Sequence, residues 1–89
     1  MIDENEFFYY LNREYEKLKI VFEKIKFKDK DIEKFVRAYY EDMKYFYNKK
    51  DYLKAFELEN YIWGILDALA NLNIIYVPED IKNWFKIIK

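Results

Sequence analysis

"DYLKAFELENYIWGILDALANLN", residues 51–73, spaces its apolar side chains every three or four positions, which is the period of one face of an α-helix. These side chains are Ala55, Leu58, Ile62, Ile65, Leu69 and Leu72. Asp51 precedes the first turn and suits a helix N-cap, because its carboxylate can accept a hydrogen bond from a free backbone N–H. The spacing predicts a helix over residues 52–72 with one apolar side for packing.

Two earlier segments of the chain, residues 3–26 and 30–48, have the same rhythm. Their seams are Phe8, Leu11, Tyr15, Leu18, Phe22 and Ile25 in the first, and Ile32, Val36, Tyr39, Met43 and Phe46 in the second. The turns between the segments are too short for parallel neighbours, so successive helices must run antiparallel. Pro78 suits the start of a short fourth helix over residues 79–88. We predict an all-α fold in one domain, residues 1–89: an antiparallel up-down-up three-helix bundle with a short fourth C-terminal helix.

The composition excludes whole classes of reaction. The chain contains no His, Cys, Ser, Thr or Gln, and therefore has no imidazole base, thiolate or hydroxyl nucleophile of the usual kinds. Glu57, Asp67 and Asp42 are the candidates for a metal site or an acid–base pair, but the Glu-x-x-His motif of di-metal bundles is impossible without His. We expect no catalytic residues, no cofactor and no metal site.

The charge pattern offers one alternative function. The net charge is −1, so the chain as a whole does not attract nucleic acid. Lysines nevertheless gather around Phe27, where they could neutralise phosphates beside a stacking aromatic ring. The lysines of this weak nucleic-acid patch are Lys24, Lys26, Lys28 and Lys30. Asp29, Asp31 and Glu33 lie beside them and oppose this interpretation, so we expect a solvated turn and no strong nucleic-acid binding.

Targeting signals and membrane spans are not indicated. The N-terminus, MIDENEFFYY, is acidic where a secretory signal would be basic, and the chain has no Cys for a disulfide. The nearly uncharged run 60–78 is interrupted by Asp67, three asparagines and Pro78, which argues against a membrane span. We expect a cytoplasmic protein without a membrane segment.

A polar stripe runs along the helix expected over residues 52–72. At about 100° per residue, five of its positions fall within an arc of roughly 80°. One interpretation is a solvated helix face; the other is a contact surface, because Gly64 costs about 1 kcal/mol relative to Ala and opens the backbone to close approach. With Tyr61 at its edge, the candidate interaction surface consists of Glu57, Asn60, Tyr61, Gly64, Asp67 and Asn71.

The tyrosine content indicates surface contacts. Ten tyrosines exceed what a three-helix core can bury, and Tyr is favoured at interfaces. Those that lie off or beside the apolar seams are Tyr9, Tyr10, Tyr40, Tyr45, Tyr47 and Tyr61. A biased amino-acid composition is the alternative explanation. We expect a non-enzymatic protein–protein interaction module or oligomeric scaffold, as a dimer or with an unidentified protein partner, with weak nucleic-acid binding as the alternative.

Residues 39–75, YYEDMKYFYNKKDYLKAFELENYIWGILDALANLNII, resemble an archaeal family described as domain-of-unknown-function family 357. The family pattern reads approximately Y-x-x-D-x-x-Y-F, then D-Y-x-x-A-F, then Y-x-x-G-x-L-D-A. The chain departs from it at Lys50 and Asn73, where glycines are usual, and at Ile62, where a small residue is common. Asn73 can still end the helix, because Asn tolerates the left-handed conformation. The resemblance implies a small helical archaeal protein with no established activity.

Overall fold

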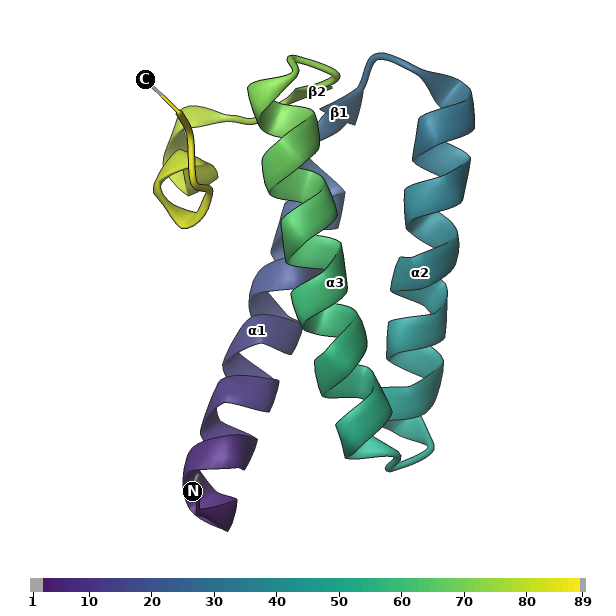
Figure 1. Cartoon of the computed structure of the whole chain (residues 1–89), viewed down its shortest axis with the longest axis vertical. Coiled ribbons are helices and arrows are strands. Elements are labelled where there is room, and N and C mark those ends of the chain that lie inside the picture. The colour runs from purple at the N-terminus through teal and green to yellow at the C-terminus, as the bar shows by residue number, and fades with distance from the viewer. Residues whose placement is uncertain (1–2, 89) are drawn as a thin grey trace.

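Three long helices make up most of the molecule in a computed structural model, which describes residues 3–88 (Figure 1). The elements, in chain order, are α1 (Glu4–Lys24), β1 (Lys26–Phe27), α2 (Lys30–Asn48), α3 (Tyr52–Asn71), β2 (Ile75–Tyr76) and the 3₁₀-helix η1 (Glu79–Trp84). Successive long helices run in opposite directions, α2 lies beside α3, and α1 crosses behind α3 (Figure 1). The predicted all-α class and the up-down-up order of the helices are confirmed.

An aspartate caps the N-terminus of each long helix. Asp3, Asp29 and Asp51 each accept a hydrogen bond from the backbone N–H three residues later, at 2.8, 2.9 and 3.4 Å. Each cap satisfies one of the N–H groups that an α-helix leaves free at its start. The predicted N-cap role of Asp51 is confirmed.

The first helix ends at Lys24, two residues earlier than predicted, and a small sheet follows it. Ile25 adopts an extended conformation and is buried. The next two residues form β1, which pairs antiparallel with β2, with Lys26 opposite Tyr76 and Phe27 opposite Ile75. The sheet ties the turn after α1 to the end of α3. Strands of two residues are too short to show the alternation of apolar and polar side chains, so no sequence pattern predicts this sheet.

The core follows the predicted seams with corrections on each helix. Leu11, Leu18, Val36, Met43 and Ile62 have no exposed surface. The core also takes in side chains outside the predicted seams, namely Val21, Tyr40, Glu59 and Leu66. The expectation that Tyr40 lies off the seam was therefore wrong, and so was the placement of Leu72, which is 68% exposed.

Two stacked aromatic pairs join α1 to α2. The rings of Tyr15 and Tyr47 lie 3.7 Å apart and almost parallel, and those of Phe22 and Tyr40 lie 4.1 Å apart. Burial raises the pKa of Tyr40, as it does that of Tyr15. Aromatic stacks of this kind add to the free energy gained by burying their area. They explain why Tyr40 is part of the core.

The C-terminal element differs from the predicted helix over residues 79–88. It is a six-residue 3₁₀-helix, Glu79–Trp84, that starts after Pro78. Ile81 and Phe85 bury their side chains against the bundle, and Phe85 meets Trp63 edge to face at 5.4 Å. The chain then continues without helical structure through Ile88. The predicted helix over residues 79–88 is therefore replaced by a shorter 3₁₀-helix that ends at Trp84.

Candidate functional site

The first half of the polar stripe on α3 faces solvent. Glu57 and Asn60 are exposed, and Tyr61 is 51% exposed. A Cβ atom added at Gly64 would meet no atom within 4 Å outside its own helix backbone and chain neighbours. The side-chain amide of Asn60 donates to the Phe56 carbonyl at 3.1 Å. This part of the stripe is available for a contact.

The second half of the stripe is already engaged. Asp67 and Asn71 bind backbone groups of the C-terminal segment, at Lys86 and Ile88. The sequence placed these two polar residues on the correct helix face, but it gave no indication that the chain's own end would bind them. The six candidate residues are therefore divided between an open part and a covered part.

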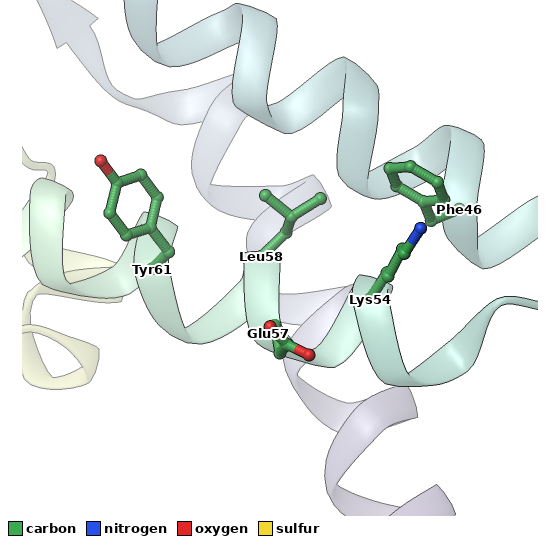
Figure 2. A pocket seen from close by; sticks show the side chains of 5 residues that line it. All are labelled: Phe46, Lys54, Glu57, Leu58 and Tyr61. Carbon is green, nitrogen blue, oxygen red and sulfur yellow. The ribbon is translucent and has the colours of Figure 1, made fainter.

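An open groove of about 450 Å³ lies between α2 and α3 beside the open half of the stripe. We call it the α2–α3 groove, and its lining residues are Phe46, Lys54, Glu57, Leu58 and Tyr61. Figure 2 shows Lys54 reaching from α3 towards Phe46 on α2, whereas Glu57, which also lines the groove, points away from Phe46. The Lys54 ammonium lies 5.2 Å from the centre of the Phe46 ring, in a cation–π contact.

Two of the predicted surface residues, Glu57 and Tyr61, line this groove, and three of its residues were not predicted to do so. Phe46 and Leu58 belong to the apolar seams that were predicted to pack inside the bundle. Both are only partly buried, because α2 and α3 leave that edge of their contact uncovered. The helical period identifies which side of a helix is apolar, but it does not show how much of that side the neighbouring helix covers.

Aromatic side chains continue the surface from the groove along α2. Tyr61 meets Tyr39 edge to face at 5.0 Å, and Tyr39 meets Phe35 in the same manner at 5.2 Å. The hydroxyl of Tyr61 raises the pKa of Tyr39. Phe35 is 54% exposed. The groove and these aromatic side chains therefore lie next to one another over α2 and α3.

The remaining candidate tyrosines differ in their exposure. Tyr9 and Tyr10 on α1 and Tyr45 on α2 are exposed, as expected from their positions off the seams. Tyr47 is partly buried and its hydroxyl donates to the side chain of Asn12. The excess of tyrosine at the surface is therefore real, but it is smaller than the sequence suggested.

The four lysines of the weak nucleic-acid patch do not form one free cluster. Lys24 pairs with Asp80 and holds the pKa of that carboxyl below its usual range. Lys28 donates to the side chain of Asn73 at 2.8 Å. Lys26 and Lys30 are exposed. Half of the patch is thus engaged in contacts within the chain.

The three carboxylates considered for catalysis lie in separate surroundings. Glu57 lines the groove, Asp42 is exposed on α2, and Asp67 holds the C-terminal segment. Across residues 3–88, no group of three or more acidic side chains is placed to hold a metal ion. Over the same range, no helix combines the length and apolar character that crossing a membrane requires.

Fold and surface together define a small α-helical bundle with an open apolar groove on its second helical hairpin. The family model described as "Protein of unknown function (DUF357)" matches residues 8–75, and the chain therefore belongs to that family. No curated protein and no solved structure matches the chain. The matched range includes α2, α3 and most of α1, and it leaves η1 and the C-terminal segment outside.

Proposed function

We propose that the protein is a non-enzymatic interaction module that forms a homodimer through the α2–α3 groove and the aromatic side chains beside it. The observation that supports this proposal is the open groove with a row of aromatic side chains beside it, Tyr61, Tyr39 and Phe35, of which Tyr61 is half exposed. Exposed apolar faces of this kind are typical of protein contact sites, and Tyr is among the residues that contribute most to them.

The charges on this face favour a second copy of the chain as the partner. Lys54 and Glu57 carry opposite charges, lie three residues apart on α3 and both line the groove (Figure 2). In a two-fold symmetric contact each surface meets itself in the opposite direction, so Lys54 of one copy can approach Glu57 of the other. Two antiparallel helix pairs that meet in this way make a four-helix arrangement, in which the apolar faces cover one another.

Sedimentation velocity across the micromolar range tests the dimer directly. We expect the full chain to dimerise and Tyr61→Asp to weaken the dimer by at least about 10-fold, because a buried charge replaces a contact anchor. Tyr9→Asp is the matched control, since Tyr9 is similarly exposed but lies on α1 away from the groove lining. A monomer at every concentration, or equal weakening by both substitutions, would contradict the proposal.

A further inference from the structure

The C-terminal segment is held on α3 by hydrogen bonds to its backbone. The N–H of Lys86 donates to Oδ1 of Asp67 at 3.1 Å, and the N–H of Ile88 donates to Oδ1 of Asn71 at 2.6 Å. Nδ2 of Asn71 donates to the carbonyl of Lys86 at 2.8 Å. Two side chains on adjacent turns of α3 therefore satisfy three backbone groups of a short segment.

The geometry of these contacts matches one edge of an extended chain. Residues 86 and 88 are alternate positions, and alternate residues of an extended chain present their backbone groups to the same side. The side chain of Asn71 pairs with the segment as a neighbouring strand would, because its Oδ1 accepts from one backbone N–H and its Nδ2 donates to one carbonyl. A further bond from its Nδ2 to the Asp67 carbonyl, at 2.8 Å, orients the amide towards the segment.

The side chains of the segment show which position the site can distinguish. Lys86 and Ile88 are exposed, the latter at 83%, so their side chains contribute little to the contact. Ile87, between them, is 37% exposed, and it forms part of the wall of a cavity of about 210 Å³ together with Ala70, Tyr76, Val77 and three further residues. Proteins recognise extended peptides by backbone hydrogen bonds at alternate positions together with pockets for side chains, and here the open cavity lies directly beside the middle position.

We propose that Asp67, Asn71 and the adjoining cavity form a binding site for an extended peptide of another protein that carries a branched aliphatic residue at its middle position. In this structure the chain's own residues 86–88 occupy the backbone-binding part of the site as a self-ligand, and the cavity beside Ile87 stays open. The two polar residues lie inside the family-matched range 8–75, whereas the self-ligand lies outside it. This site is separate from the α2–α3 groove and does not depend on the dimer.

Proline substitutions in the full-length chain can free the site without changing it. Lys86→Pro with Ile88→Pro removes both backbone donors, because proline has no N–H. Proline is compatible at position 86, since Phe85 before it is already extended (φ −99°, ψ 149°). A blocked peptide with the sequence of residues 85–89, FKIIK, is then added to the isotope-labelled double variant, and the side-chain amide signals of Asn71 are followed by NMR.

We expect these signals to shift and saturate in the double variant, and the peptide to bind the wild-type chain at least about 10-fold more weakly, because the self-ligand competes. The peptide FPIPK, which lacks the two donors, should cause no shift. A titration of the double variant with FKIIK that leaves the Asn71 signals unchanged up to millimolar peptide would overturn the proposal, as would equal shifts with FPIPK.

Hydrogen exchange in the unmodified protein gives an independent measurement. The amides of Lys86 and Ile88 should exchange several-fold more slowly in the wild type than in Asn71→Ala, because opening of the contact must precede exchange. Equal exchange rates in the two proteins would show that the segment is not bound at Asn71, and would overturn the proposal even if the double variant fails to fold.

Discussion

The carboxyl group of Glu59 and the indole N–H of Trp63 lie one turn apart on α3, both are buried, and neither has a hydrogen-bond partner within residues 3–88. Glu59 has no exposed surface. Burial raises the pKa of Glu59 to about 9, with a further contribution from the negative charge of Glu14. The carboxyl is therefore neutral in the folded chain at pH 7 and ionised in the unfolded chain.

This difference predicts that stability falls as the pH rises. Below the unfolded-state pKa of about 4.5, Glu59 is protonated in both states and has no effect. Between about 4.5 and 9, ionisation of Glu59 lowers the free energy of the unfolded chain alone, so the stability of the fold decreases. This loss of stability is complete once the pH exceeds the folded-state pKa. Glu59→Gln should remove this dependence and stabilise the protein at pH 7 by up to about 3 kcal/mol.

Urea unfolding of the two proteins at about pH 5, 7 and 9 measures the effect. The stability gained by Glu59→Gln should grow with each step. Glu57→Gln is the matched control, because Glu57 lies two residues earlier on the same helix and is exposed. A constant difference between Glu59→Gln and the wild type over this range would contradict the expectation.

The turn between α2 and α3 contains a residue under backbone strain. Lys50 has a φ of 69°, in the left-handed region that favours glycine. Lys50→Gly should therefore raise the free energy of unfolding by about 1 kcal/mol, less the extra entropy that glycine gives the unfolded chain. Thermal or urea unfolding measures the change. Lys49→Gly is the control, since Lys49 has a φ of −77° and should gain nothing. Destabilisation by Lys50→Gly would show that contacts of the Lys50 side chain stabilise the fold by more than the backbone strain destabilises it.

The lysines near β1 should not bind nucleic acid strongly. Lys24 and Lys28 are engaged by Asp80 and Asn73, so few free charges remain to displace counterions from phosphates. Fluorescence anisotropy with a labelled duplex and a labelled single strand, at about 150 mM salt, should show no binding in the micromolar range or below. Sub-micromolar binding that Lys26→Glu abolishes would establish the alternative function.

The helical part of the fold could be predicted because its signals are local. A period of three and four residues and an aspartate at each start, such as Asp51, depend only on neighbouring residues. Burial of Glu59 could not be predicted in this way, since a carboxyl is usually excluded from a core and its position depends on how α1 crosses α3. The pairing of Lys26 with Tyr76 joins residues far apart in the chain, and no local pattern indicates it.

The candidate sites also divide into residues that a local pattern predicts and residues whose position depends on tertiary packing. Tyr61 and Glu57 were found because their helix face could be calculated from the sequence. Phe46 could not be assigned to the groove, because its partial exposure depends on the packing angle between α2 and α3. The covering of Asp67 and Asn71 by residues 86–88 depends on the course of the chain after η1, which has no periodic signal.

Gly64 distinguishes between the two interpretations of the polar stripe. A Cβ added there meets open space, so Gly64→Ala should raise stability by up to about 1 kcal/mol through helix propensity alone. Gly64→Leu adds a bulky side chain one turn from Tyr61 and should interfere with any partner that approaches the backbone closely. We expect Gly64→Ala to retain the dimer and Gly64→Leu to weaken it several-fold in sedimentation velocity, with urea unfolding as a check that both variants fold. If both variants gain stability and associate as the wild type does, the open half of the stripe is a solvated helix face, and Gly64 has no role in docking.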